Sequence, residues 1–268
     1  MKKEIRIAII TESKEGSASI IIPEIHKFLK NNIVGVIYCE SVAKKNNNHY
    51  KRTFKKMLKI GFFGSLIGIY LRKWYRQDLK NYINIQPIKK NCENLSIPFY
   101  NSVGLNSLET RQKLESLNVD LAISLGCSYI SSKVFNIPTK GMINIHHEIL
   151  PAYQNAQSII WQLYNNSSKT GYTIHKITKK IDDGPILFKE EREISFKDTL
   201  GETVSFNYAQ SIIKSGNGLI EVIKLLKNGL FEESFKYQSE PKGHYTTPSI
   251  LSLIKIYLNW KNLKSKIK

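Results

Sequence analysis

Short apolar runs alternate with a helical pattern near the start of this chain, and this alternation limits the fold more than any other feature. Apolar residues dominate 5–11 and 34–39, and a helical pattern at 20–29 lies between them. Two strands joined by a helix pair in parallel through a right-handed crossover. Similar apolar runs recur at 97–100, 120–125, 142–146 and 172–177. We therefore expect an α/β chain with one mostly parallel sheet.

Helices should flank this sheet and continue after it. The segment Asn106–Glu109 resembles a capping box that opens a helix to about Leu117. Residues 158–165 also look helical. Residues 203–227 predict one or two helices, broken near Gly216 and Gly218, and 249–268 predict a basic amphipathic helix. The expected architecture is Rossmann-like, with flanking helices and a short C-terminal extension. No G-x-G-x-x-G motif follows the first strand, so the main signal for a nicotinamide cofactor is missing.

The formal net charge of +18 is concentrated in two segments. Between Lys44 and Lys90 thirteen basic residues accompany one acid, Asp78, and five lysines with no acid lie from Leu253 to Lys268. This leaves 22 of the 40 basic and 21 of the 22 acidic residues elsewhere, so the body of the chain is nearly neutral. Such basic segments attract phosphates, nucleic acid or acidic lipid headgroups, although solvated lysines explain them equally well.

The 44–90 segment interrupts the strand–helix alternation with an Asn run, basic clusters and the apolar stretch GFFGSLIGIYL. We interpret it as a helical insert packed over one end of the sheet. Contact with a membrane surface is the alternative, since basic residues flank the apolar ones.

Several classes of protein are disfavoured by composition. The longest apolar stretch, Ile60 to Leu71, is too short to span a bilayer, and the N-terminus lacks a signal-peptide pattern. Cys39, Cys92 and Cys127 are widely spaced and odd in number, which fits neither a disulfide framework nor a zinc motif. We expect a cytoplasmic protein without a metal cofactor.

Polar residues follow two of the predicted strands. Asn144 and His146 are two residues apart, so on a strand both point to one face, while Ile145 points into the core. The carboxyl edge of a parallel sheet is where open α/β folds bind ligands. About 36 residues later, Asp182 and Asp183 precede Gly184 on a loop after another strand. An amide, an imidazole and a carboxylate are thus predicted near one sheet edge.

These residues belong to a longer ordered pattern. The chain reads NIHHEILPAY at 144–153, then Trp161, TGYTIH at 170–175 and DDGPIL at 182–187. This pattern resembles the core signature of the folate-dependent formyltransferases, and the resemblance extends more loosely over about residues 1–200. It is most like the nucleotide-sugar N-formyltransferases, which are related to the methionyl-tRNA and glycinamide ribonucleotide enzymes. The resemblance implies a formyltransferase catalytic domain at 1–200 with the insert at 44–90, and a C-terminal helical or strand extension at 201–268.

The resemblance also implies the catalytic residues, which are Asn144, His146 and Asp182. We prefer Asp182 to Asp183 because Asp183 occupies the variable position before Gly184. Asn144 would donate an N–H to the oxygen that gains charge as an amine attacks the formyl carbon. His146, held by Asp182, would share that charge and move protons. The co-substrate implied is 10-formyltetrahydrofolate, and no metal is required.

Further residues are implied to bind the folate. They lie on the segment after the fourth strand, on the turn after His146 and on the loop around Asp182, and comprise Cys127, Ser128, Tyr129, Ile130, Glu148, Ile149, Leu150, Pro151, Lys180 and Asp183. We interpret His147 and His175 as structural, Trp161 as a core residue and Cys127 as a wall residue without nucleophilic function. Family members commonly carry Arg-Gly and Ser where this chain has Gln154-Asn155 and Glu148, so these positions bear on how an anionic substrate is held.

The favoured function is transfer of a formyl group to the amino group of a nucleotide-linked sugar, for polysaccharide biosynthesis. Methionyl-tRNA formyl transfer is the alternative, although the roughly 70 residues after the catalytic region do not read as a tRNA-binding barrel, so nucleic acid is not the expected partner. Formylation of glycinamide ribonucleotide is third, and folate deformylation is disfavoured. A folate- or sugar-binding protein without turnover is the non-enzyme hypothesis. A homodimer sealed by the C-terminal helix, or membrane-surface contact through that helix or 44–90, are further expectations.

Overall fold

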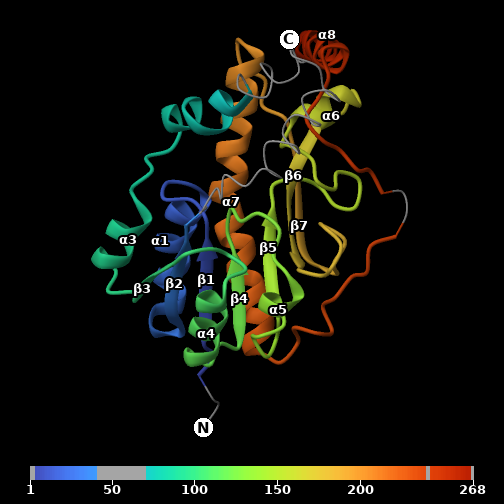
Figure 1. Ribbon diagram of the computed structural model, residues 1–268. Helices are drawn as coiled ribbons and strands as arrows, with labels where there is room; N and C mark the ends of the chain where they lie inside the picture. Colours follow the sequence, from blue (N-terminus) through green and yellow to red (C-terminus); the bar gives the residue numbers. More distant parts are fainter. Residues whose placement is uncertain (1–3, 41–70, 240–241, 267–268) are drawn as a thin grey trace, which may run out of the picture.

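The computed structural model describes residues 4–40, 71–239 and 242–266, in which seven strands form one sheet (Figure 1). The strand order is β3-β2-β1-β4-β5-β6-β7. The strands are β1 (Ile7–Thr11), β2 (Ile33–Cys39), β3 (Phe99–Ser102), β4 (Leu121–Ser124), β5 (Met142–His146), β6 (Lys169–Lys176) and β7 (Ile186–Glu193). Strands β1 to β5 pair in parallel, whereas β6 and β7 are antiparallel. The predicted Rossmann-like, mostly parallel sheet is confirmed.

Helices cover both faces of the sheet. The described helices are α1 (Ser17–Leu29), the 3-10 helices η1 (Lys30–Asn32) and η2 (Asp78–Asn81), α3 (Ile88–Asn94), α4 (Leu108–Ser116), α5 (Ser132–Phe135), α6 (Ile160–Tyr164), α7 (Leu200–Lys227) and α8 (Ile250–Ser265). Residues 71–76 are also helical. The part of the 44–90 insert at 44–70, including most of its apolar stretch, lies outside the described residues.

Helix α7 differs from the sequence expectation, because it is one unbroken helix through Gly216 and Gly218. A Cβ at position 218 would lie 2.6 Å from the hydroxyl oxygen of Tyr172 on β6. Glycine therefore lets the helix approach the sheet closely, and burial of the helix outweighs the roughly 1 kcal/mol that glycine costs in a helix.

The two faces of the sheet are separated by the alternation of side chains along each strand. On β1, Ile7 and Ile9 pack in the cluster under α1 and α7, while Ala8 and Ile10 pack in the cluster on the opposite face, under α4 and α5. All five β1 residues are buried. This two-sided burial explains why the strand reads as a continuous apolar run.

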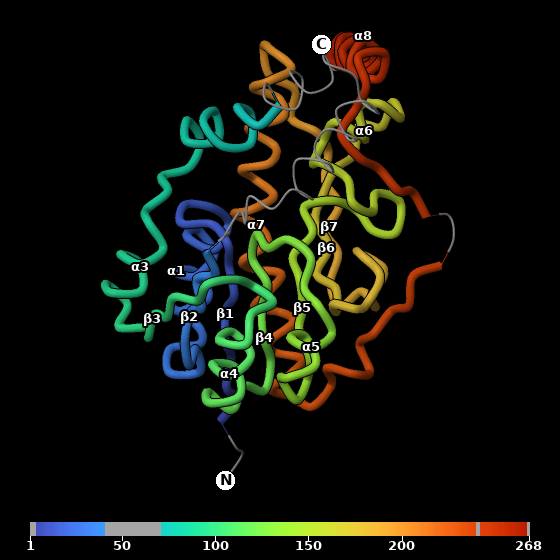
Figure 2. The backbone as a smooth tube through the Cα atoms, viewed as in Figure 1, coloured from blue at the N-terminus to red at the C-terminus, as the bar shows by residue number. Residues whose placement is uncertain are grey.

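A third apolar cluster lies at one end of the sheet. It contains Leu71 and Trp74 from the insert, Trp161 from α6, and Ile256 and Trp260 from α8. Figure 2 shows α6, α8 and the start of α7 gathered at this end, away from the N-terminus. The segment after residue 200 thus packs on the body of the protein, and its division into a separate unit stays a prediction.

The chain order across the sheet reverses between β1 and β4, because β2 and β3 lie on one side and β4 and β5 on the other. At such a point the loops leaving the carboxyl ends diverge and open a crevice. Among the described helices, none has both the length and the apolar character needed to cross a bilayer.

Candidate active site

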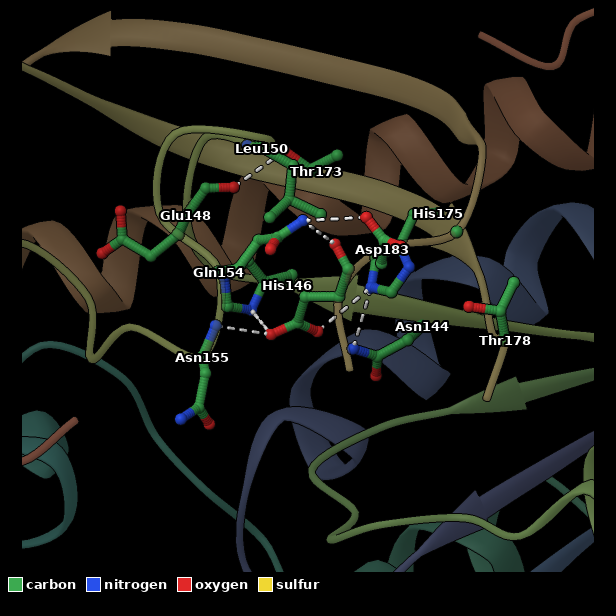
Figure 3. A network of polar contacts seen from close by, with 12 residues as sticks. Asn144, His146, Glu148, Leu150, Gln154, Asn155, Thr173, His175, Thr178 and Asp183 are labelled. Carbon is green, nitrogen blue, oxygen red and sulfur yellow. Dashed lines mark hydrogen bonds and ion pairs between the residues drawn. The ribbon is translucent and has the colours of Figure 1, made fainter. Parts of the chain in front are cut away.

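Asn144 and His146 reach the carboxyl end of β5 on the same side of the strand, as their spacing predicts. Ile145 between them is 5% exposed and packs in the core. The antiparallel pairing of β5 with β6 sets His175 opposite Asn144 and Thr173 opposite His146. Figure 3 shows Asn144, His146 and His175 together at this strand edge.

Asp182 arrives from the loop between β6 and β7. Its backbone is in the left-handed region, with φ of 52°, which aspartate tolerates better than most residues. A Cβ at Gly184 would clash with the Lys176 carbonyl oxygen, so the glycine lets the loop fold back on β6. The carbonyl oxygen of Asp182 accepts hydrogen bonds from the amides of Gln154, at 3.1 Å, and Gln238, at 2.8 Å.

The Asp182 carboxylate faces both histidines. Its Oδ2 lies 3.6 Å from Nδ1 of His146, and its Oδ1 lies 3.4 Å from Nε2 of His175. The backbone N–H of Asn155 donates to Oδ2 at 2.9 Å. Asn144 Nδ2 lies 3.4 Å from the same His175 nitrogen. The three predicted catalytic residues are therefore linked, His146 directly to the Asp182 carboxylate and Asn144 through His175.

Burial and charge oppose each other at this cluster. Burial lowers the pKa of His146, and the Asp182 carboxylate acts in the opposite direction. Burial alone would raise the pKa of Asp182, but the hydrogen bond from His175 and the charge of His146 outweigh it, so the pKa is lowered. Asp182 is thus an anion near neutral pH. The other nitrogen of His146, Nε2, lies 2.8 Å from the Tyr153 carbonyl oxygen, so both ring nitrogens face acceptors.

A cavity of about 550 Å³ opens beside these side chains. One part of its wall is formed by the loop after β4 and the loop after β6, and another by the helical stretch at 71–76 and the turn before α6. The lining residues include Asn144, His146, His175 and Asp182, with Ser128, Tyr129, Ile130, Thr178, Lys180 and Ile181 from the two loops, and Arg72, Tyr75, Arg76, Gln157 and Ser158 from the second part.

The predicted folate residues divide into two groups. Cys127, Ser128, Tyr129, Ile130 and Lys180 line the cavity. Asn106 holds the loop that contains residues 127–130, because its side chain donates to the Tyr129 carbonyl and accepts the Ser131 N–H. The capping box expected at Asn106–Glu109 differs in detail, because the N-cap residue of α4 is Ser107, whose side chain accepts the Thr110 N–H. Burial raises the pKa of the Cys127 thiol to about 12, which suits a wall residue without nucleophilic function.

The second group is not part of the described cavity lining. It comprises Glu148, Ile149, Leu150, Pro151 and Asp183. Lys242 donates to Asp183 at 2.6 Å, and the Leu150 N–H donates to Thr173 at 3.0 Å. Folate contact through these five residues stays a prediction.

Glu148 is fully buried, and its Oε1 accepts the Ile159 N–H at 2.6 Å. Figure 3 shows its carboxylate directed away from Asn144 and His175. Burial raises its pKa well above the ordinary value, although the Ile159 N–H acts against this shift. Glu148, one of the positions at which this chain departs from the family pattern, thus directs its carboxylate away from two residues of the candidate site.

Several residues of the site were not singled out from the sequence. His175 was interpreted as structural, yet it contacts both Asn144 and Asp182. Its place opposite Asn144 depends on the pairing of β5 with β6, for which the sequence offered no signal. Arg72 and Arg76 were recognised only as part of a basic segment. Gln154, which replaces the usual arginine, is buried and holds the Asp182 loop instead of reaching an anion.

Comparison with known proteins gives this geometry a context. A methionyl-tRNA formyltransferase from Marinobacter nauticus is 27% identical over 214 residues, 80% of this chain and 66% of the relative. One from Thermotoga maritima is 31% identical over 160 residues, 59% of this chain and 49% of the relative. The chain therefore spans about half to two thirds of the length of these curated relatives.

Solved structures share the fold. A glycinamide ribonucleotide transformylase from Symbiobacterium toebii matches with a TM-score of 0.58 at 14% identity, covering 85% of this chain and 90% of the other. An N-formyltransferase from Helicobacter canadensis, in complex with folinic acid and dTDP-3-aminofucose, matches with a TM-score of 0.54 at 17% identity, covering 92% and 72%. The model of one family, described as formyl transferase, matches residues 43–211, more than half of the chain. Together with the clustered Asn144, His146 and Asp182, this match shows that the chain belongs to the formyl transferase family.

Proposed function

We propose that this protein transfers a formyl group from 10-formyltetrahydrofolate to an amine. The observation that carries the proposal is the grouping of Asn144, His146 and Asp182 at one edge of a 550 Å³ cavity. Members of the matched family are enzymes that transfer formyl groups. The non-enzyme hypothesis, binding without turnover, has to explain why an amide, an imidazole and an ionised carboxylate converge there.

The folate would supply the formyl carbon, which forms a bond to the amine nitrogen as its bond to the folate nitrogen breaks. Asn144 donates an N–H to the formyl oxygen, where negative charge develops. His146 would exchange its contact with the Tyr153 carbonyl oxygen for the amine, take the proton that the amine loses and return one to the departing folate nitrogen. Asp182 keeps the imidazole oriented and stabilises its charged form. His175 holds the second carboxylate oxygen and so positions Asp182.

The residues of the loop part of the cavity fit a flat, polar-edged ring system. Tyr129 and Ile181 are 54% and 52% exposed at the cavity wall and offer apolar surface for stacking. Polar groups of Ser128, Thr178 and Lys180 lie along the same wall. These features support folate binding by Cys127, Ser128, Tyr129, Ile130 and Lys180. We assign none of the described residues to a metal site. The expectation that the reaction requires no metal stays a prediction.

As acceptor we propose the amino group of a nucleotide-linked sugar, which would serve polysaccharide assembly. The shared fold with an N-formyltransferase that binds dTDP-3-aminofucose supports this class, as do the arginines in the cavity wall. The second candidate acceptor is methionyl-tRNA, which the names of the curated relatives favour. A cytoplasmic location, a homodimer and contact with a membrane surface stay predictions.

The test is an assay of tetrahydrofolate release by the purified chain with 10-formyltetrahydrofolate and a panel of amines. The panel contains dTDP- and UDP-linked amino sugars, glycinamide ribonucleotide and methionyl-tRNA. We expect release with an amino sugar nucleotide, with a formylated product seen by mass spectrometry. Release only with methionyl-tRNA would support the second candidate. Tight folate binding with no product from any amine would instead support the binding-protein hypothesis.

A further inference from the structure

Two arginines of the helical stretch at 71–76 line the cavity that Asn144 and His146 also line. Arg72 and Arg76 are four residues apart, so their side chains lie on one face of the helix with roughly 5–6 Å between their Cβ atoms. Leu71 and Trp74 are buried, with exposed fractions of 0% and 5%. The helix therefore packs its apolar residues against the protein, while Arg72 and Arg76 are exposed and belong to the cavity lining.

The helix is held in this orientation by contacts on its inner side. Trp74 packs in the third apolar cluster with Trp161 of α6 and Trp260 of α8. The hydroxyl of Tyr75 donates to the Ser158 carbonyl at 2.5 Å, and its ring meets that of Tyr208 edge-on, with centroids 5.2 Å apart. Rotating the helix to take the arginines out of the cavity would break these contacts, so the pair is preorganised.

The described part of the chain provides no acid that pairs with the two arginines. Lys73, on the same helix, pairs with Asp78 at 3.7 Å. Within the described part of the chain, neither Arg72 nor Arg76 has an ion pair or hydrogen bond with an acid. Positive charge on this part of the concave wall raises the local electrostatic potential and attracts anions, while the Asp182 carboxylate lies elsewhere in the same lining. A pair of guanidinium groups suits phosphate oxygens, because each can donate two parallel hydrogen bonds.

Another group on this part of the wall lacks a partner. Gln157 lines the cavity, and its side-chain oxygen is buried without a hydrogen bond to any described residue. Such an atom costs free energy unless a ligand or water donates to it. A hydroxyl or amino group of a bound sugar would satisfy it.

We propose that Arg72 and Arg76 bind the diphosphate group of the acceptor, and that this second part of the cavity is the acceptor site. The inference rests on the proposed function, which supplies the chemistry. It assigns the acceptor to the part of the wall formed by the helical stretch at 71–76 and the turn before α6, and the folate to the part formed by the two loops. It names a nucleoside diphosphate-linked amine as the ligand class. The phosphates of a tRNA end are the other source of the same chemistry, which the experiment separates.

The test is titration calorimetry with dTDP, UDP and inorganic pyrophosphate, with folinic acid present. Variants are Arg72→Ala, Arg76→Ala and the double variant Arg72→Lys/Arg76→Lys, which retains the charge. Lys73→Ala is the matched control, because it removes one positive charge from the same helix but not from the cavity. Loss of one charge-assisted contact is expected to weaken nucleoside diphosphate binding about tenfold to a hundredfold. The control is expected to stay within about twofold. Far-ultraviolet circular dichroism checks that each variant is folded.

Unchanged dissociation constants in both alanine variants would overturn the inference, as would failure of the unaltered protein to bind any of the three probes. Tighter competition by methionyl-tRNA than by dTDP or UDP, lost in the same variants, would overturn the nucleoside diphosphate assignment. Failure of the proposed function would give a different result from failure of this inference. The protein would then bind diphosphates in an arginine-dependent manner but release no tetrahydrofolate with any amine. Conversely, tetrahydrofolate release with an amino sugar nucleotide, together with an unchanged acceptor KM in both alanine variants, would overturn this inference and leave the proposed function standing.

Discussion

Two groups of polar residues near the end of β5 differ in the partners of their polar atoms. Asn144, His146 and Asp182 line the cavity and are linked to one another through His175 and the Asp182 carboxylate. Directly after His146, His147 also belongs to the cavity lining, but its Nδ1 lies 3.3 Å from the Ser211 hydroxyl, and Glu148 accepts the Ile159 N–H. We call the first group the catalytic edge and the second, His147 and Glu148, the buried polar pair.

The difference teaches that burial of a titratable group does not by itself mark it as functional. Burial lowers the pKa of His147 to about 3 and raises that of Glu148 well above its ordinary value, so it disfavours the charged form of each side chain. At the catalytic edge, in contrast, Asp182 remains charged because two histidines face it. Changes at the catalytic edge should therefore alter turnover, and changes in the buried polar pair should alter stability.

The largest effect is expected from His146→Gln, with His147→Gln as the matched change one residue along. Loss of the proton carrier should lower kcat by about 10³-fold, within the range of general acid–base catalysis. His147→Gln should leave kcat within about threefold, because its ring nitrogen contacts Ser211 and not the reacting atoms. Folate binding, followed by fluorescence titration, should survive in both variants. Equal loss of turnover in the two variants would remove the distinction between the groups.

A smaller loss of turnover is expected from Asn144→Ala. Removing one donor to a developing oxyanion lowers kcat by about 10²–10³-fold. The melting temperature should change little, since the Asn144 amide makes only a long contact, 3.4 Å, with His175. Asn101→Ala, at an exposed position on β3, is the control and should retain full activity. An Asn144→Ala variant with unaltered kcat would show that the oxygen is held elsewhere.

His147 should make the protein less stable as the pH falls. Its folded pKa of about 3 lies below the ordinary value of 6.5, so protonation favours unfolding. The stabilisation is full above pH 6.5 and is lost by up to about 1.4 kcal/mol for each pH unit below it. Urea unfolding at pH 7 and pH 5 should show this loss in the parent and a smaller one in His147→Gln.

The pKa of His146 is also lowered by burial, so this residue adds to the dependence of the unfolding free energy on pH with the same sign. The difference between the parent and His147→Gln therefore isolates the contribution of His147. His244→Gln, at an exposed histidine, is the control and should keep the parent's slope. An unchanged slope in His147→Gln would mean that this ring is protonated in the folded protein.

The smallest effect is expected from Glu148→Gln. A carboxyl group with a raised folded pKa contributes its full stability only below the unfolded pKa, about 4.3, and loses it as the pH rises. Glutamine removes this penalty and keeps an acceptor for the Ile159 N–H. The melting temperature at pH 8 should rise by about 2–4 °C, the equivalent of about 1 kcal/mol. A kcat changed by more than about threefold would place Glu148 at the catalytic edge after all.

Much of the fold followed from local patterns. The apolar run of β1 and the strand–helix–strand order predicted a parallel sheet, and the spacing of Asn144 and His146 predicted their shared face. The glycines of α7 misled the prediction, because a helix break and a close contact with Tyr172 both favour glycine. His175 was missed because strand register is set by tertiary pairing, which no local pattern encodes.

The sequence by itself determined most of the elements, the buried faces and the two segments that carry chemistry, since these depend on residue spacing within a few turns or strands. The tertiary structure alone decided that Asp182 faces the histidines while Asp183 binds Lys242, and that Glu148 turns inward. The tertiary structure also decided that Arg72 and Arg76, which belong to a basic segment distant in sequence, line the cavity. The physical reason is that convergence of side chains depends on how loops and packed helices meet across long sequence separations.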